Sequence, residues 1–240
     1  MKKAPVTRAI LLAAGRGTRL QPHTDVTPKP LLVHRGKPTL DYLMDSLLAA
    51  GVNDVVLVTH YLGEQIEAYA ELRAARSQQR VRCVHQSHLF GTAHALQAVV
   101  DTTPDMVDMP FVLSATDYLV PREFFVNLLQ FHAAHDGSVS ASLKQLDESE
   151  LTSRSSVRFN ADQSIAEIVE KPDPGKAPSS IGANLTFVLP SAIVSYVGDV
   201  PMSPRGEQEV QQAINSLISA GETAYGLIQP IAAEWQAPGK

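Results

Sequence analysis

Short apolar runs alternate along the first half of this chain with stretches in which apolar residues recur every three or four positions. The runs predict buried strands at residues 9–13, 55–58, 80–85 and 111–113. The spaced stretches predict amphipathic helices at residues 40–48, 63–77, 93–100 and 124–129. Thr92 is expected to cap the third helix through its hydroxyl group. Strands and helices that alternate in this order are typical of βαβ units and a mostly parallel sheet.

The second half of the chain is less regular and contains more strands than helices. Its apolar runs predict strands at residues 138–143, 156–159, 165–169, 185–189 and 225–228. One amphipathic helix is predicted over 210–218, and the proline-rich stretch 171–180 is typical of a loop. A chain of 240 residues can bury one large core. We therefore expect a single α/β domain over 1–240, with a larger parallel part over about 8–135 and a small antiparallel part over about 136–236.

The composition is that of an ordinary folded protein. Charged residues make up 19% of the chain and hydrophobic residues 44%, which argues against disorder. No apolar stretch approaches the length of a membrane span, and Arg8 interrupts the segment in which a secretory signal would need an apolar run. The single cysteine, Cys83, stands in a predicted strand and cannot form an internal disulfide. These features predict a cytoplasmic protein that does not associate with membranes.

Positive charge is concentrated at the N-terminal end of the chain. The first 40 residues hold eight lysines and arginines and a single acid, Asp25, whereas the whole chain has a net charge of −5. A cationic island in an acidic protein indicates a small anionic ligand. Nucleic acid usually requires a basic surface over the whole domain, so we expect no nucleic-acid partner.

A glycine loop directly follows the first predicted strand. Gly15 and Gly17 let backbone N–H groups approach phosphate oxygens at the carboxyl end of that strand. Arg16 and Arg19 add positive charge to the loop, and so does Lys29, which stands between two prolines. The alternative is a solvated basic segment. Charges embedded among glycines and prolines favour a polyphosphate site instead.

Three further groups of polar residues follow predicted strands. Gln86 comes directly after the third strand, Asp117 follows the fourth, and Glu170-Lys171 follow the strand at 165–169. Ligands of open α/β sheets bind at the carboxyl ends of the strands, so an acid, an amide and cations at this edge predict a nucleotide site with a metal. The structural alternatives are a turn residue for Asp117, a solvated loop charge for Lys171 and a strand cap for Gln86.

Several common nucleotide and metal motifs are absent. A Rossmann fingerprint requires a third glycine where Leu20 stands, and the glycines are not followed by the lysine of a P-loop. The chain has no His-Glu-x-x-His or Cys-x-x-Cys motif, which argues against a zinc site. His85, His88 and His94 flank Gln86, but their spacing matches no metal pattern, so we interpret them as polar or lining residues.

The segment Leu12–Leu20, together with Pro28-Lys29-Pro30, resembles the glycine loop of the sugar-phosphate nucleotidyltransferase family, which includes the glucose-1-phosphate thymidylyl- and uridylyltransferases. Further motifs of this family follow in order, at Gln86 with Gly91-Thr92-Ala93, Thr116-Asp117, Glu170-Lys171-Pro172 and Gly206-Glu207. The resemblance covers about residues 8–236. It implies a Rossmann-like, mostly parallel mixed sheet flanked by helices, with a nucleotide-binding part followed by a small antiparallel part that binds the sugar phosphate.

The resemblance implies that an NTP and a sugar 1-phosphate react to give an NDP-sugar and pyrophosphate. The attacking phosphate oxygen is already anionic at neutral pH and needs no general base, so the enzyme's task is to stabilise charge around the α-phosphorus. By the family pattern, Arg19 would hold the β- and γ-phosphates and Lys29 would neutralise the α-phosphate. Asp117 would bind Mg²⁺, which prefers hard oxygen ligands and retains waters.

The resemblance also implies residues for the base and the acceptor. Gln86 has one acceptor and two donors and can pair with a pyrimidine edge, which favours UTP or dTTP. Lys171 would bind the phosphate of the sugar, Glu170 would accept hydrogen bonds from its hydroxyls, and Asn184 would line the sugar pocket. The other nucleotide-binding residues implied in this way are Leu12, Ala14, Gly15, Gly17, Thr18, Gly91 and Thr92.

The chain departs from the family pattern at two places. Ser155-Ser156 replace a Tyr-Gly pair that lies against the sugar, which leaves another phosphate or a phosphonate open as the acceptor. Ala237 stands where the family has a second metal-binding acid. The candidate substitutes for that acid are Glu207, Glu209 and Glu234.

A second class of function stays open at this point. The chain could be a nucleotide-binding regulatory relative without turnover, although a protein that only binds need not keep Asp117, Lys29 and Lys171. The sequence also leaves a homo-oligomer open.

Overall fold

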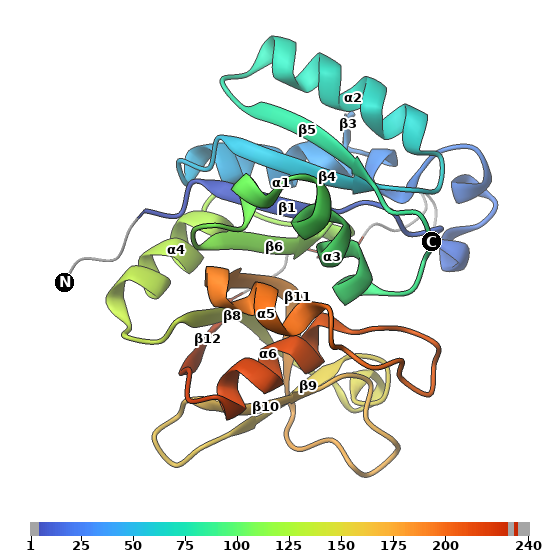
Figure 1. Ribbon diagram of the computed structural model, residues 1–240. Helices are drawn as coiled ribbons and strands as arrows, with labels where there is room; N and C mark the ends of the chain where they lie inside the picture. The colour runs from blue at the N-terminus through green and yellow to red at the C-terminus, as the bar shows by residue number, and fades with distance from the viewer. Residues whose placement is uncertain (1–4, 230–232, 235–240) are drawn as a thin grey trace.

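A nine-stranded sheet runs through the centre of the protein in the computed structural model, which describes residues 5–229 and 233–234 (Figure 1). Four neighbouring strands are parallel and lie in the order β5, β4, β1 and β6. Their bounds are Arg80–His85 for β5, Asp54–Thr59 for β4, Arg8–Leu12 for β1 and Phe111–Ala115 for β6. The chain thus leaves β1 toward β4 and β5 on one side and returns on the other side with β6. Such a reversal leaves a crevice for ligands at the carboxyl ends of the strands.

The strand β11 (Ile181–Leu189) joins these parallel strands to an antiparallel part. It pairs antiparallel with β6, with β8 (Val139–Gln145) and with β9 (Ser155–Phe159). Two more strands complete the sheet, β10 (Ile165–Val169) beside β9 and β12 (Ala224–Ile228) beside β8. The predicted α/β fold, a mixed sheet flanked by helices with a small antiparallel part, is confirmed. Because both parts share one sheet, their division into two functional parts stays a prediction.

One predicted strand is longer than its apolar pattern indicates. The strand expected over 185–189 begins at Ile181 and includes Gly182 and Asn184, which interrupt the apolar run. Gly182 pairs with strands on both sides, and a Cβ at this position would stand 2.7 Å from the Ser155 carbonyl oxygen. The backbone ladder therefore continues through a position where a close neighbouring strand requires glycine.

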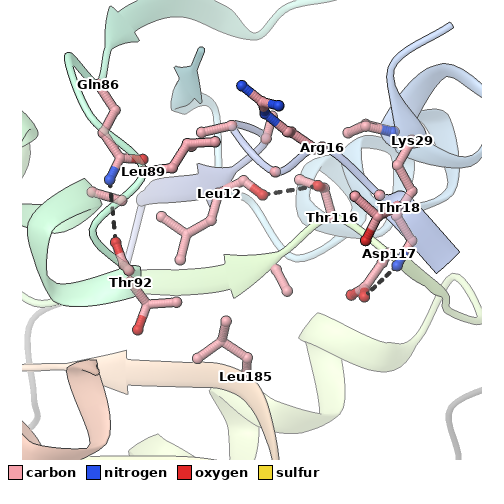
Figure 2. Close-up of a pocket in the computed structure, with 18 of the residues that line it drawn as sticks. Leu12, Arg16, Thr18, Lys29, Gln86, Leu89, Thr92, Thr116, Asp117 and Leu185 are labelled. Atoms are coloured by element: carbon pink, nitrogen blue, oxygen red, sulfur yellow. Dashed lines mark hydrogen bonds and ion pairs between the residues drawn. The ribbon is translucent and has the colours of Figure 1, made fainter. Parts of the chain in front are cut away.

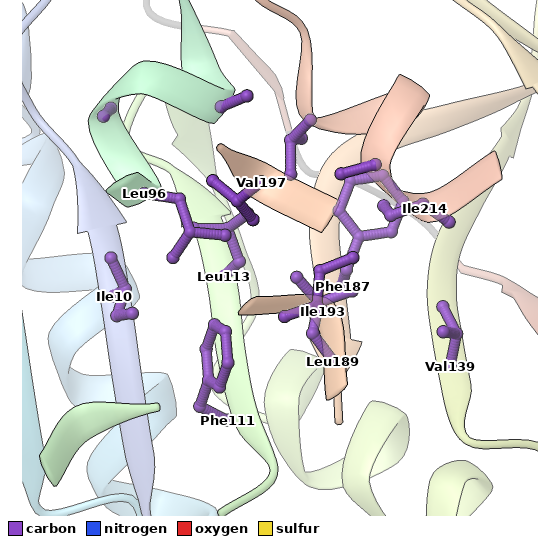
Figure 3. Close-up of a cluster of buried hydrophobic side chains, with 14 of the residues drawn as sticks. Ile10, Leu96, Phe111, Leu113, Val139, Phe187, Leu189, Ile193, Val197 and Ile214 are labelled. Carbon is purple, nitrogen blue, oxygen red and sulfur yellow. The ribbon is translucent and has the colours of Figure 1, made fainter. Parts of the chain in front are cut away.

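Helices cover both faces of the sheet, as the spacing of apolar residues predicts. One face carries α1 (Thr39–Ala49), α2 (Gly63–Arg76) and α4 (Phe124–Ala134), and the other carries α3 (Thr92–Thr102), α5 (Val194–Val197) and α6 (Val210–Ser219). Side chains of β1 alternate between the two cores, because Ile10 packs on the α3 side while Ala9 and Leu11 pack on the α1 side. Figure 3 shows the core on the α3 side. None of the helices in the described ranges is long and apolar enough to cross a membrane.

Several elements of two or three residues were not predicted, because so short a segment shows no periodicity. Four of them are strands, paired as β2 (Val33–His34) with β3 (Lys37–Pro38) and β7 (Tyr118–Leu119) with β13 (Ala233–Glu234). The others are 3₁₀ turns: η1 (Thr18–Leu20), η2 (His23–Asp25), η3 (Lys29–Leu31), η4 (Pro104–Met106), η5 (Glu148–Glu150) and η6 (Ser191–Ile193). The first three turns and β7 lie beside the candidate site.

Candidate active site

A cavity of about 460 Å³ opens at the carboxyl ends of β1 and β6, where the topology leaves a crevice (Figure 2). The loops that follow β1, β5 and β6 form its walls. Among the residues predicted for the site, the following line this cavity: Leu12, Ala14, Gly15, Gly17, Thr18, Arg19, Lys29, Gln86, Gly91, Thr92 and Asp117. The fold thus gathers one group of polar and glycine residues from three separate segments of the chain.

The two glycines of the loop after β1 have different surroundings and therefore different reasons to lack a side chain. Gly17 has a left-handed backbone (φ +63°), and a Cβ there would stand 3.0 Å from the Thr24 side chain and 3.2 Å from Lys29 Cβ. The Thr24 hydroxyl donates a hydrogen bond of 3.0 Å to the Gly17 carbonyl, which holds the loop against η2. Gly15 faces open space, so its backbone is accessible to a ligand in the cavity.

Two arginines of this loop carry charge that no acid neutralises within the described part of the chain. Arg16 and Arg19 are exposed and line the cavity. The Arg16 guanidinium lies 5.7 Å from the centre of the Tyr61 ring, a cation–π contact that restrains this side chain. Two unpaired cations at the edge of a cavity attract an anion such as a polyphosphate.

Lys29 and Asp117 form an ion pair inside the cavity (Figure 2). Lys29 Nζ lies 2.7 Å from Asp117 Oδ2, and the two side chains are 19% and 23% exposed. A hydrogen bond of 2.9 Å from the Thr116 hydroxyl to the Leu12 carbonyl fixes the loop after β6 against the loop after β1. The second carboxylate oxygen, Asp117 Oδ1, is buried and has no hydrogen-bond partner in the described residues.

This unpartnered oxygen fits a hard metal ion. A buried acceptor without a partner is costly unless a ligand, ion or water completes it. Mg²⁺ prefers oxygen ligands and accepts a single protein carboxylate together with phosphate oxygens and waters. The described residues contain no cluster of three histidine, cysteine or acidic side chains that could hold a metal. Asp117 therefore fits Mg²⁺ only as part of a site that the phosphates of a nucleotide would complete.

The three acids considered as a second metal ligand lie in different surroundings. Glu207 lines the cavity. Glu209 is buried just before α6 and forms an ion pair with Arg205, and it is not among the residues that line the cavity. The backbone of Glu234 pairs with β7, beside the loop that holds Asp117. Ala237 lies outside the described residues.

Gln86 lies directly after β5, with its side-chain amide nitrogen turned toward the start of α3. Nε2 donates hydrogen bonds to the Gly91 carbonyl at 3.2 Å and to His94 Nδ1 at 2.9 Å. Gly91 has a φ of +108°, and a Cβ there would stand 2.5 Å from the Gln208 carbonyl oxygen. The loop between Gln86 and Gly91 is therefore packed tightly against the segment that precedes α6.

The expectation that Thr92 caps α3 is wrong. Gly91 is the N-cap of this helix and provides no side-chain hydrogen bond. The Thr92 hydroxyl instead accepts a hydrogen bond of 2.9 Å from the backbone N–H of Val210, the first residue of α6. Thr92 thus satisfies a free donor at the start of another helix, and that partner lies 118 residues away in the sequence.

The residues predicted for the acceptor are not among those that line the cavity. Lys171 Nζ lies 3.7 Å from Glu170 Oε1, and Glu170 Oε2 accepts hydrogen bonds from Gln211 Nε2 at 2.8 Å and from the Ser155 hydroxyl. Asn184 is buried in β11, where its Nδ2 donates to the Ser142 hydroxyl at 3.0 Å. The structure joins Lys171 and Glu170 to each other but not to the group around Asp117.

Sequence reasoning missed Leu185, which lines the cavity next to Asn184 in the chain. Successive side chains of a strand point to opposite faces, so only one of these two neighbours can face the cavity. The sequence analysis predicted Asn184, the polar one of the two, to line the site. The alternation of β11 was a usable sign, because Leu185 lies two positions before the buried Phe187.

Comparison with known proteins identifies the family to which this chain belongs. The family model described as "Nucleotidyl transferase" matches residues 8–237. The chain belongs to the nucleotidyl transferase family. A UTP–glucose-1-phosphate uridylyltransferase, AglF of Haloferax volcanii, is 32% identical over 221 residues, which are 90% of this chain and 85% of that protein. The catalytic subunit beta of a Drosophila melanogaster mannose-1-phosphate guanylyltransferase is 29% identical over 187 residues, and this chain spans about half (49%) of its length.

Solved structures of UDP-glucose pyrophosphorylases have the same fold. A UDP-glucose pyrophosphorylase in complex with UDP-glucose aligns with a TM-score of 0.79 at 20% identity, over 93% of this chain and 91% of that one. A UTP-bound enzyme of the same kind from Acinetobacter baumannii aligns with a TM-score of 0.77 at 22% identity, over 92% and 86% of the two chains. The resemblance found in the sequence motifs is confirmed, and so is the fold that it implies.

Proposed function

We propose that this protein transfers a nucleotidyl group from UTP or dTTP to a sugar 1-phosphate. An oxygen of the sugar phosphate attacks the α-phosphorus and forms a new P–O bond. The bond from the α-phosphorus to the oxygen that bridges to the β-phosphorus breaks, and its electron pair leaves with pyrophosphate. The observation that carries the proposal is the Lys29–Asp117 pair in a cavity edged by Arg16 and Arg19. Within the described residues, Asp117 Oδ1 has no hydrogen-bond partner and the two arginines form no ion pair.

The charges in the cavity support nucleotidyl transfer. The reaction brings two anions together, and its transition state spreads negative charge over the phosphate oxygens. Arg19 and Arg16 would hold the β- and γ-phosphates, and Lys29 would lie beside the α-phosphate. Asp117 would hold Mg²⁺, which supplies positive charge to the phosphates when it is bound. The reaction needs no general base, because the attacking phosphate oxygen of the acceptor is already ionised. The cations stabilise the negative charge of the transition state.

The contacts around Glu170 support an acceptor site next to the loop between Gln86 and Gly91, which we call the base loop. The segment before α6 packs against Gly91 at one end, through Gln208, and Arg205 in the same segment donates a hydrogen bond of 3.2 Å to the Glu170 carbonyl. Lys171 follows directly and carries the charge that a sugar phosphate needs. The relatives that use glucose 1-phosphate and mannose 1-phosphate support a hexose 1-phosphate as the acceptor.

A different phosphate or a phosphonate is the second candidate acceptor. The Ser155 hydroxyl and Gln211 both bond the Glu170 carboxylate that would otherwise receive sugar hydroxyls. A carboxylate occupied in this way favours an acceptor with fewer hydroxyl groups. The cytoplasmic location and a homo-oligomeric state stay predictions.

Pyrophosphate release tests the proposal. The purified protein would be assayed with Mg²⁺ and each of UTP, dTTP, CTP, GTP and ATP, against glucose 1-phosphate, mannose 1-phosphate, N-acetylglucosamine 1-phosphate, phosphocholine and a simple phosphonate. We expect release with a uracil or thymine nucleotide and a hexose 1-phosphate. Nucleotide binding with no release for any pair would favour the regulatory alternative.

A further inference from the structure

The amide nitrogen of Gln86 is fully used inside the protein. Both of its hydrogens have acceptors, the Gly91 carbonyl at 3.2 Å and His94 Nδ1 at 2.9 Å. The backbone is held as firmly, because the Gln86 N–H donates to the Thr59 carbonyl at 2.8 Å and the Gln86 carbonyl lies 2.7 Å from His60 Nδ1. The amide oxygen alone takes no hydrogen bond from the described residues, and Gln86 lines the cavity. In Figure 2 a dashed line marks a hydrogen bond of the Gln86 amide nitrogen, and the amide oxygen lies on the other side of the amide group.

An amide can be turned over with little change of shape, so a neighbouring group must decide which end faces a ligand. His94 is that group, since Nδ1 can accept from Gln86 Nε2 only while it carries no proton. The Gly91 carbonyl favours the same orientation, because it is an acceptor and would repel the amide oxygen. The Gly91 carbonyl and a neutral His94 that carries its proton on Nε2 therefore hold Gln86 in this orientation together.

The surroundings of His94 keep its ring neutral. Partial burial and the nearby His88 lower the pKa of His94, while Asp101 on the same helix opposes this shift. Phe90 lies between the two histidines, stacked on His88 at 5.1 Å and edge-on to His94 at 5.3 Å. A neutral ring is thus the form expected near pH 7. Of its two tautomers, the one protonated at Nε2 can accept from Gln86, and the Gly91 carbonyl favours it because it holds Gln86 Nε2 toward the ring.

We infer that His94 is a positioning residue for base selection, which fixes Gln86 so that only its amide oxygen faces the base. An oxygen requires a donor on the ring. Uracil and thymine offer N3–H at their pairing edge, whereas cytosine has an acceptor at N3 and its donor on this edge is the exocyclic N4 amino group. The selection therefore requires that the Gln86 oxygen face N3 of the ring. The orientation therefore selects UTP or dTTP over CTP among bases of the same size. This inference rests on the proposed function only for the class of ligand, a nucleoside triphosphate.

Two substitutions at His94 separate positioning from simple packing. In His94→Asn the side-chain oxygen takes the place of Nδ1 as an acceptor but does not titrate. In His94→Leu the acceptor is lost while apolar volume is retained. Affinities for UTP and CTP would be measured by calorimetry without an acceptor, with circular dichroism as the check on folding. We expect His94→Asn to keep the preference for UTP and His94→Leu to lower it about tenfold, the effect of one lost hydrogen bond.

The pH dependence gives a readout that packing alone would not change. Between about pH 8 and 5.5, protonation of His94 turns Nδ1 into a donor and favours the reversed amide. The ratio of UTP to CTP affinity should then fall with pH in the wild type and stay constant in His94→Asn. Ionisation of the phosphates affects both nucleotides alike and cancels in this ratio. Should His94→Leu fail to fold, the comparison of the wild type with His94→Asn decides alone.

Four results would decide against the inference: a wild type that prefers CTP, an unchanged preference in a folded His94→Leu, parallel pH curves for the wild type and His94→Asn, or loss of the preference in a folded His94→Asn. Failure of the proposed function looks different. In that case the protein still binds UTP more tightly than CTP, and this preference still depends on His94, but no pyrophosphate is released with any acceptor. A wild type that binds neither nucleotide would overturn both.

Discussion

Lys29 Nζ lies 2.7 Å from Asp117 Oδ2, although 88 residues separate the two in the sequence. Lys29 binds one carboxylate oxygen, and the other is buried and has no hydrogen-bond partner in the part of the chain that the structure describes. This relationship orients the carboxylate and keeps a cation beside it while no ligand is bound. A nucleotide with its metal would find the acid and the lysine already in place, so little reorganisation is needed on binding.

The substitution Asp117→Asn should abolish most turnover while the fold survives. The amide has the same shape and can still accept a hydrogen bond from Lys29, but it no longer carries the charge that holds a metal. We expect the rate of pyrophosphate release to fall by at least about 10²–10³-fold, as for other charge-stabilising groups. The melting temperature should stay close to that of the wild type. The control is Asp162→Asn in an exposed turn, where both activity and melting should be unchanged, and near-normal activity in Asp117→Asn would overturn the metal assignment.

Magnesium should bind weakly to the nucleotide-free protein. One carboxylate without a second acid gives little affinity for an ion that dehydrates reluctantly. Titration of Mg²⁺ by calorimetry should show no micromolar binding in the absence of nucleotide and a clear increase in affinity once UTP is present. Micromolar binding to the free protein would mean that a second ligand exists. A Glu207→Gln variant would then tell whether this acid, which lines the cavity, is that ligand.

Loss of the Lys171 ammonium group should weaken the use of the acceptor and leave the affinity for the nucleotide unchanged. We expect Lys171→Ala to raise the KM for the sugar 1-phosphate and lower kcat, with a combined loss in kcat/KM of about 10–100-fold for a charge-assisted contact. The affinity for UTP in calorimetry should stay near the wild-type value. Lys176→Ala is the matched control, because Lys176 lies in the same loop and forms its ion pair with the exposed Asp173. Weaker UTP binding with an unchanged KM for the acceptor would contradict the assignment.

The substitution Gly91→Ala should destabilise the protein through the base loop. Its backbone is left-handed, and the added Cβ would stand 2.5 Å from the Gln208 carbonyl oxygen. Strain and overpacking together should lower the free energy of unfolding by about 2–4 kcal/mol in urea titrations. Gly175→Ala is the control, since φ is also positive (+74°) but no atom lies within 4 Å of the added Cβ. That variant should lose only about 1–2 kcal/mol, and equal losses in the two would show that contact with Gln208 is unimportant.

The sequence by itself determined the order and the type of the main elements. Each strand and helix is encoded by neighbouring side chains, whose period matches the two faces of a strand or one face of a helix. The continuous apolar run at residues 9–13 predicted a buried strand, and in the structure Ile10 and Leu11 of β1 pack into two different cores. The glycine loop could also be predicted from local sequence, because Gly15 and Gly17 follow the first strand directly and exert their effect through the backbone of this segment. Ordered motifs also made the family clear.

Only the tertiary structure decided which side chains meet. Lys29 and Asp117, or Gln86 and His94, are joined by packing of separate elements, and no local period encodes a partner across a sheet. The same holds for Thr92, whose hydroxyl serves α6 and not its own helix, and for Gly91, whose lack of a side chain is explained by Gln208. Hydrogen bonds and steric contacts act over a few ångströms in space, whereas periodicity acts along the chain. The sequence could therefore single out Lys29, Asp117, Gln86 and Gly91 as candidates, but the contacts of these residues arise only when the chain is folded.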